Sequence, residues 1–387
     1  MSQPAPADSV DSHVLTRVVN RIGFIELDRP KALNALTIDM VHAMHAALDA
    51  WREDPHVLAA IVRSTSPRAF CAGGDVRALY EAYRRGDQPA VDTFFIDEYR
   101  LDHAIFTWPK PYIALMNGVV MGGGMGISQG ARRTGGLRVV SGTTRLAMPE
   151  TRIGLFPDVG VGWFLARARG ATGRYLAVTG ETIDAADALY AGLADLLLDE
   201  SAWPALLDAL QTESFASGEE VVARIRRAAA DANGAHGANG QDHGGSSLAG
   251  ARAWIDQHFS LPDVPQVLAS LEAAVSTNGH EDGHADWAER TIGVLRERSP
   301  LSMAVSLEVV SRSDGSMADT LRRDLDLTRS TFARGDVMEG IRARLIDKDD
   351  RPQWRIARIE DLRAEEVERM FDSPWSATQH PLADLQG

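Results

Sequence analysis

The chain has 387 residues, 44% of them hydrophobic, and a formal net charge of −14. This length can bury a large core in one large domain or two ordinary ones, and the acidic balance argues against a nucleic-acid partner. One cysteine, Cys71, excludes an intrachain disulfide and favours a reducing compartment, and no long apolar run predicts a transmembrane helix. We therefore expect a cytoplasmic α/β protein without a nucleic-acid or membrane partner.

Strands and helices alternate in the first half of the chain. Residues 1–12 lack the features of a signal peptide and are expected to be a disordered lead. Apolar, β-branched residues on either side of Asn20-Arg21 predict a hairpin of Val14–Val19 and Gly23–Leu27. Helical spacing and a capping Asp75 predict the next helices, and short apolar runs predict buried strands. The helices are Asp39–Arg52, Val76–Arg84 and Phe94–Thr107; the strands are Ala59–Ser64 and Tyr112–Met116, with a loop over Arg68–Gly74.

The remainder is expected to be largely helical. We divide the chain into an α/β core with a mostly parallel sheet over 13–212, a variable helical segment over 213–290 and a helical C-terminal region over 291–387. Residues 230–250 predict a Gly-rich, low-complexity insert. His236 and His243 within it have no ligands at metal spacing, so no metal site is expected. The predicted helices are Ala166–Thr179, Thr182–Leu198, Pro262–Ser276, Asp286–Arg298, Pro300–Arg312 and Met317–Arg334.

Two glycine-rich strings carry the main functional signal. The first runs over Phe70–Asp75, and the second over Asn117–Gly126 directly after a predicted strand. Glycines lack Cβ, so their backbone N–H groups can approach a substrate closely. Two such groups can converge on one carbonyl oxygen, and the acids of Met148-Pro149-Glu150 and Phe156-Pro157-Asp158 follow downstream. Donors and carboxylates at one site predict acyl chemistry.

These strings together resemble the crotonase (enoyl-CoA hydratase/isomerase) superfamily. The passages Phe94–Tyr99, Met148–Gly160 and Glu339–Asp349 narrow the resemblance to the branch that hydrolyses 3-hydroxyisobutyryl-CoA in valine catabolism. The resemblance implies a spiral of repeated strand-strand-helix units followed by a helical C-terminal region. It also implies an acyl-CoA substrate and homo-oligomers, although the additional helical region stands to alter the assembly.

The resemblance implies a role for each site residue. Gly74 and Gly123 match the two backbone N–H groups of an oxyanion hole, and Glu98 matches a substrate-binding acid. Glu150 matches the principal catalytic carboxylate, acting either as a general base toward water or as a nucleophile on the thioester. Asp158, which the hydrolase branch carries, would orient the 3-hydroxyl group or assist proton transfer. The second glutamate of a hydratase would fall at Gly126, which has no side chain, and this favours hydrolysis.

The CoA moiety requires local positive charge despite the acidic total. Arg29 and Lys31 lie in the region that matches the family's CoA-binding loop, and Arg68 and Arg77 flank the first glycine string. No cofactor is expected, because CoA is part of the substrate. The alternatives are an enoyl-CoA hydratase or isomerase on the same fold, and a CoA-binding protein without activity.

Overall fold

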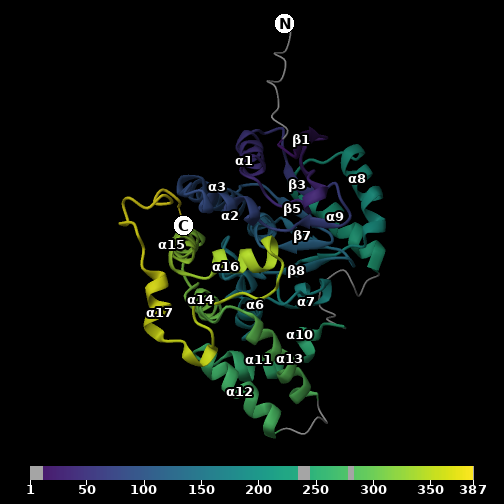
Figure 1. The fold of residues 1–387 in the computed structure, drawn as a ribbon. Coiled ribbons are helices and arrows are strands. Elements are labelled where there is room, and N and C mark those ends of the chain that lie inside the picture. Colours follow the sequence, from purple (N-terminus) through teal and green to yellow (C-terminus); the bar gives the residue numbers. More distant parts are fainter. Residues whose placement is uncertain (1–11, 234–244, 278–282, 387) are drawn as a thin grey trace.

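Six strands form the main sheet, in the order β1-β2-β3-β5-β7-β9. The computed structural model describes residues 12–233, 245–277 and 283–386, and the sheet lies in its N-terminal half (Figure 1). β1 pairs antiparallel with β2, and each later pair is parallel, so the mostly parallel sheet is confirmed. The strands are Val14–Val19, Ile22–Leu27, Ala59–Ser64, Tyr112–Met116, Leu137–Val140 and Leu196–Leu197.

The predicted hairpin is present. Asn20 and Arg21 both adopt left-handed backbone conformations, with φ of 50° and 63°. Two such residues make the tight turn whose twist suits paired antiparallel strands. The turn is fixed further by the Asn20 amide, which donates to the Leu210 carbonyl over 2.8 Å. The hairpin is thereby tied to helix α8 (Trp203–Thr212), far along the chain.

A second sheet is built from three very short parallel strands, in the order β4-β6-β8. Each follows a strand of the main sheet, so the pairs β3-β4, β5-β6 and β7-β8 repeat one strand-strand unit. Since the short strands are parallel, their carboxyl ends share one edge, and Gly74, Gly123 and Glu150 follow them there. The strands are Ala69–Cys71, Val119–Met121 and Arg145–Ala147. The segment predicted as a loop over Arg68–Gly74 therefore contains a strand.

The two faces of the main sheet are buried against different elements. Ile22 and Phe24 of β2 face a cluster formed with α8 and with α9 (Gly218–Asn233), whereas Ile25 and Leu27 face the larger core. The same alternation recurs on β3 and β5, as the side-chain period of two requires. Figure 1 shows α8 and α9 on one side of the sheet and α1 to α3 on the other.

Helix α2 has the predicted bounds, whereas other core helices begin or end at residues that differ from the prediction. Helix α2 begins after Asp75, whose carboxylate accepts from the Ala78 N–H as the predicted cap. Helix α3 begins six residues before the predicted Phe94, because Asp87 caps it and accepts from the Ala90 N–H. The core helices are α1 Ile38–Arg52, α2 Val76–Arg84, α3 Gln88–Phe106, α4 Gly123–Gln129, α5 Val161–Leu165, α6 Thr172–Thr179 and α7 Ala185–Tyr190.

Three predictions for the middle of the chain are wrong. The single helix expected over Ala166–Thr179 begins only at Thr172, with left-handed Gly170 shortly before it. The helix expected over Thr182–Leu198 is limited to α7, and Gly192, with φ of 73°, leads into β9. The Gly-rich insert expected over 230–250 is shorter, because α9 reaches Asn233 and α10 begins at Ser247. His236 and His243 lie outside the described residues, as do residues 1–11.

The C-terminal third is helical up to Ile346, as predicted, and then mostly irregular. Helix α15 packs against α3 of the core, so this region is not a detached lobe (Figure 1). Among the described residues beyond 346, the helical elements are short turns. The helical region expected over 291–387 is therefore continuous only in its first part. The elements are α10 Ser247–Gly250, α11 Arg252–Phe259, α12 Val264–Thr277, α13 His284–Glu297, α14 Pro300–Ser311, α15 Met317–Arg334, α16 Val337–Ile341, a π-helical turn Arg342–Ile346 and α17 Ala364–Glu368.

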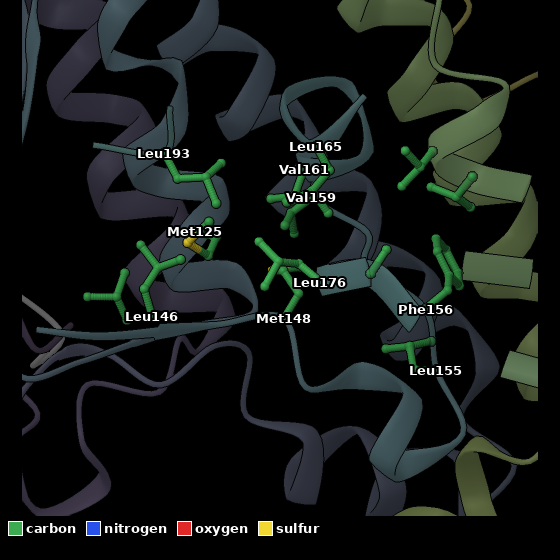
Figure 2. Close-up of a cluster of buried hydrophobic side chains, with 14 of the residues drawn as sticks. Met125, Leu146, Met148, Leu155, Phe156, Val159, Val161, Leu165, Leu176 and Leu193 are labelled. Carbon is green, nitrogen blue, oxygen red and sulfur yellow. The ribbon is translucent and has the colours of Figure 1, made fainter. Parts of the chain in front are cut away.

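Helix α4 is the buried centre of the site region. All seven of its residues are buried, and its Met125 belongs to an apolar cluster with Leu146, Met148 and Leu176 (Figure 2). A helix with glycines along its length can approach its neighbours this closely. Among the described residues, none of the helices has the length and apolar character needed to cross a membrane.

Candidate active site

Gly74 and Gly123 lie next to each other at the carboxyl ends of β4 and β6. A Cβ placed on Gly123 would lie 3.3 Å from the Gly74 nitrogen. In the described part of the chain neither N–H has an acceptor: Gly123 begins α4, and the adjacent backbone bonds are made by Leu36 and Asp75. Two neighbouring N–H donors without partners suit the charge of an oxyanion. The geometry is compatible with the predicted oxyanion hole.

Glu150 follows β8 and begins a short helical turn, Glu150–Ile153. Its Oε1 lies 3.0 Å from the place of a Cβ on Gly122, which brings the carboxylate beside the second glycine string. Its Oε2 is buried and has no hydrogen-bond partner among the described residues. Burial, with a smaller contribution from Asp158, raises the pKa of Glu150 well above its usual value. Such a carboxyl group has the raised proton affinity of a general base.

Asp158 faces the same space from the segment before α5. The Tyr99 hydroxyl donates to its Oδ2 over 2.7 Å. Burial raises the pKa of Asp158 to about 7, and the Tyr99 hydrogen bond works in the opposite direction. At neutral pH this carboxyl group can therefore both take up and release a proton. The turn that Pro157 predicts does bring Asp158 toward Glu150, and both line one pocket.

Helix α3 adds two more buried acids, Glu98 and Asp102, one helical turn apart. Glu98 lies so close to Gly123 that a Cβ there would collide with its Oε1, which has no partner among the described atoms. Asp102 follows Glu98 on the same helix. Both of its carboxylate oxygens are buried and have no hydrogen-bond partner among the described residues. A Cβ on Gly126 would lie 2.7 Å from Asp102 Oδ1. Burial raises the pKa of both groups well above the usual range.

One pocket of about 1030 Å³ collects these groups. Gly74, Gly123, Glu98, Glu150 and Asp158 all line it, whereas Asp102 does not. The structure therefore brings together every residue predicted for the oxyanion, catalytic and substrate roles. The groups assigned from distant parts of the sequence meet because three parallel strands end at one edge and α3 crosses it.

Arg29 and Lys31, the residues predicted to bind CoA, do not line this pocket. The Arg29 guanidinium is engaged by Asp75 over 2.9 Å and by the Ala35 carbonyl over 3.0 Å. Lys31 is exposed on a short helical turn, Pro30–Ala32. Both assignments stay predictions that this geometry does not favour. The cations that do line the pocket are Arg77, Arg152, Arg298, Arg344 and Lys348.

Sequence reasoning missed most of this cationic wall and two groups of α3. Arg344 and Lys348 lie in the Glu339–Asp349 passage. That passage indicated the family, but its cations were not recognised as candidates for CoA binding. Arg298 is held by the Thr179 carbonyl over 2.9 Å, a contact that no local pattern predicts. Tyr99 belongs to the Phe94–Tyr99 passage, but neither it nor Asp102 was given a role, and only the tertiary structure places both beside Glu98 and Asp158.

Cys71 lies at the end of β4, close to the first glycine string, and is buried. Burial raises the pKa of its thiol to about 12. A thiol of this kind carries almost no thiolate at neutral pH and packs as a small apolar group. This environment does not favour a nucleophilic role for Cys71.

Comparison with known proteins gives a consistent fold and differing names. A family model described as enoyl-CoA hydratase/isomerase matches residues 22–371. The chain is 34% identical to a protein of Gallus gallus named "3-hydroxyisobutyryl-CoA hydrolase, mitochondrial", over 92% of this chain and 88% of that one. A solved Mycobacterium thermoresistibile structure titled a carnitinyl-CoA dehydratase superposes with a TM-score of 0.80 at 34% identity, covering 93% and 96%. A Rhodobacter sphaeroides structure titled an enoyl-CoA hydratase gives 0.78 at 35%, covering 94% and 98%.

Proposed function

The chain belongs to the enoyl-CoA hydratase/isomerase family, and we propose that it hydrolyses a short 3-hydroxyacyl-CoA thioester, foremost 3-hydroxyisobutyryl-CoA, to the hydroxy acid and CoA. The observation that carries the proposal is the set of acids in the pocket. Glu150 and Asp158 share it with the N–H groups of Gly74 and Gly123, whereas Gly126 offers no carboxylate. The name of the Gallus gallus relative supports the same reaction.

The proposed reaction begins at the thioester carbonyl. Its oxygen lies between the N–H groups of Gly74 and Gly123, which stabilise the negative charge that develops as the carbon becomes tetrahedral. On one route Glu150 takes a proton from water, whose oxygen attacks the carbon; collapse of the intermediate breaks the C–S bond, and the CoA thiolate takes a proton. On the other route a Glu150 oxygen attacks, CoA leaves, and water opens the resulting anhydride. Both routes remain open.

Asp158 and Glu98 recognise the acyl end of the substrate in this proposal. Asp158, with a pKa near neutrality, accepts a hydrogen bond from the 3-hydroxyl or passes a proton to the leaving sulfur. Glu98 lies next to Gly123, and burial raises its pKa well above the usual value, which favours the neutral form that can donate a hydrogen bond. The neutral form also avoids repulsion of the developing oxyanion.

The CoA phosphates are assigned to the cationic wall of the pocket. Arg298 is a partly buried cation whose pKa is lowered by burial and by its neighbour Arg152. Lys348 lies in a turn whose other charged groups are already engaged, since Arg342 pairs with Asp347 and Asp349. Arg344 pairs with Asp350 and Arg298 with Glu297. Arg77, Arg152 and Lys348 have no ion pair among the described residues and therefore suit phosphate groups best. No cofactor is proposed, because CoA arrives with the substrate.

A thiol-release assay tests the function. The protein is incubated with 3-hydroxyisobutyryl-CoA and, separately, with crotonyl-CoA, and free thiol and loss of the enoyl absorbance are followed. Thiol release from the first substrate supports hydrolysis. Hydration of crotonyl-CoA without thiol release would instead establish the second candidate, a hydratase, in line with the name of the Rhodobacter sphaeroides protein. The absence of both reactions would leave a CoA-binding protein.

Location and assembly remain predictions. The single cysteine favours a reducing compartment, for which we propose the cytoplasm. The word mitochondrial belongs to the name of the relative. A homo-oligomer is proposed from the family, and sedimentation of the purified protein tests it.

A further inference from the structure

The backbone beside Asp158 adopts an uncommon conformation. Val159 has φ of 52° and Gly160 φ of 73°, so two consecutive residues lie in the left-handed region. For a β-branched residue this conformation is a true outlier, and it persists only where the surroundings fix it. Strained backbone of this kind is typical of functional sites. Neighbouring groups must therefore fix the conformation of Val159 and Gly160.

Helix α15 holds the turn from outside the α/β core. Its Asp324 accepts the Gly160 N–H at Oδ2 over 3.0 Å. A Cβ on Gly160 would lie 2.6 Å from the Met317 sulfur, so α15 lies directly against this backbone. On the other side, the Val159 side chain is buried and belongs to the same apolar cluster as Val161 and Leu165 (Figure 2). The strained turn is fixed from both sides.

The same helix also reaches the Asp158 carboxylate, through a chain of hydroxyl groups. Thr328, one helical turn after Asp324, lies 2.8 Å from the Tyr99 hydroxyl, which donates to Asp158 Oδ2 over 2.7 Å. An ionised carboxylate can only accept, so the Tyr99 proton points to Asp158 and Thr328 donates to the Tyr99 oxygen. Tyr99 and Asp324 are fully buried, and Thr328 nearly so. Aligned hydroxyl groups polarise one another in the same direction.

We propose that Tyr99, supported by Thr328 and by the Asp324 contact of α15, is a positioning residue that fixes the direction and ionisation of the Asp158 carboxylate. The proposal rests on the hydrolase function proposed above and extends its site into the C-terminal region. Tyr99 does not line the pocket, so it acts through Asp158.

The groups around Asp158 determine in which direction its pKa moves when the Tyr99 hydroxyl is removed. Helix α3 presents Tyr99, Glu98 and Asp102 in this region; Glu150 comes from the turn after β8, and Asp324, with Arg323 beside it, from α15. Burial, and to a smaller extent Asp324, favour protonated Asp158, whereas the Tyr99 hydrogen bond favours the carboxylate. Removing the hydroxyl therefore raises the pKa of Asp158.

The experiment compares Tyr99→Phe and Thr328→Val with matched controls. Tyr112→Phe removes another buried hydroxyl, which donates to the Ile127 carbonyl over 3.0 Å, and Thr320→Val removes another buried threonine hydroxyl of α15. We expect Tyr99→Phe to lower kcat by on the order of tenfold to a hundredfold, with little change in KM, because small misplacements of a reacting group are that costly. Thr328→Val follows with a smaller loss, and both controls keep the wild-type kcat.

Two further readouts separate positioning from mere stability. The limb of the pH–rate profile that reports Asp158 should move to higher pH in Tyr99→Phe. The double variant Tyr99→Phe/Asp158→Asn should turn over no more slowly than Asp158→Asn alone. Equal losses in Tyr99→Phe and Tyr112→Phe, an unmoved profile or fully additive losses would overturn the proposal. Should Tyr99→Phe not fold, Thr328→Val carries the same comparisons. If the wild-type protein releases no thiol, the proposed function fails, which is a distinguishable result.

Discussion

Asp102 occupies the space that a side chain at Gly126 would need, with its Oδ1 2.7 Å from the place of a Cβ. The same Cβ would lie 2.8 Å from Val159 Cβ. Position 126 is thus closed by two neighbours, one of them in the strained turn beside Asp158. A glutamate of the hydratase type cannot be added there without moving both.

Gly126→Glu is therefore expected to lose stability and not to gain hydration of crotonyl-CoA. Even Gly126→Ala should lower the free energy of unfolding by ~1–3 kcal/mol through overpacking. Urea denaturation measures the loss. Gly293→Ala is the matched control, because Gly293 lies in a helix with no atom near its Cβ direction, and it should be neutral or stabilising. A Gly126→Glu protein of normal stability that hydrates crotonyl-CoA would contradict the assignment.

Asp102→Asn should stabilise the protein at and above neutral pH. Burial raises the pKa of Asp102 above its unfolded value, with Glu98 adding to the effect. The contribution of the Asp102 carboxyl group to the free energy of unfolding is fully present below the unfolded pKa. It is lost as pH rises through the folded pKa. The amide removes that loss, so the gain in melting temperature should grow from pH 5 to pH 8. A gain that is largest at pH 5 would show that the Asp102 carboxylate is stabilised by a partner.

Glu150→Gln should abolish most turnover and leave the fold intact. General acid–base groups typically contribute on the order of 10²–10⁴-fold to a rate, and an amide is neither a base nor a nucleophile. Glu181→Gln is the control, because Glu181 also lines the pocket but accepts a hydrogen bond from Tyr175. Thiol-release rates and melting temperatures are compared. Wild-type turnover in Glu150→Gln would remove Glu150 from the mechanism.

Lys348→Ala should weaken binding of CoA thioesters through the phosphates alone. The KM for 3-hydroxyisobutyryl-CoA should rise about tenfold, the loss expected for one charge-assisted contact. The KM for the corresponding pantetheine thioester, which has no 3′-phosphate or diphosphate, should not change. Arg227→Ala, an exposed cation of α9, is the control for net charge. Equal effects on both thioesters would place Lys348 away from the phosphates.

The helical region should lose stability as pH falls below neutrality. His258 Nε2 lies 2.9 Å from His284 Nε2, and its Nδ1 lies 2.8 Å from the Ser270 hydroxyl. Burial, with His284 as a smaller cause, lowers the pKa of His258 to about 4. In the unfolded chain His258 binds a proton near pH 6.5, whereas in the folded chain it does so only near pH 4. The free energy of unfolding therefore decreases as pH falls across this window.

Comparison of the wild type with His258→Gln isolates this contribution from that of the buried acids. The difference in urea midpoint between pH 7.5 and pH 5 should shrink in the variant. An unchanged difference would mean that folding does not lower the pKa of His258.

The sequence predicted best where a pattern is long and local. Ala59–Ser64 and Tyr112–Met116 are correct to the residue, because continuous apolar runs describe strands buried on both faces. The three-residue strands β4, β6 and β8 show no period and were missed. The helix predicted to Leu198 failed because Leu196–Leu197 looks equally apolar in a helix and in β9.

The residues that line the site could be predicted from the sequence, but the residues that position them could not. Gly74, Gly123, Glu150, Asp158 and Glu98 meet in one pocket, as the motifs implied. Their supports depend on chain segments far apart: Thr328 lies 229 residues after Tyr99, and no local pattern encodes that contact. The ion pair of Arg29 with Asp75, which the sequence indicated only as a helix cap, was likewise not predicted, and the role of Arg29 in CoA binding stays a prediction.

The contact between Tyr99 and Thr328 also sets an order of events during synthesis. A ribosome that has translated both glycine strings, Glu150 and Asp158 has not yet produced α15. A nascent chain at that stage holds every reacting group but leaves the Asp158 turn without its outer support. Full thioester-cleaving activity would then arise only late in translation, once the α15 segment has emerged and docked on α3.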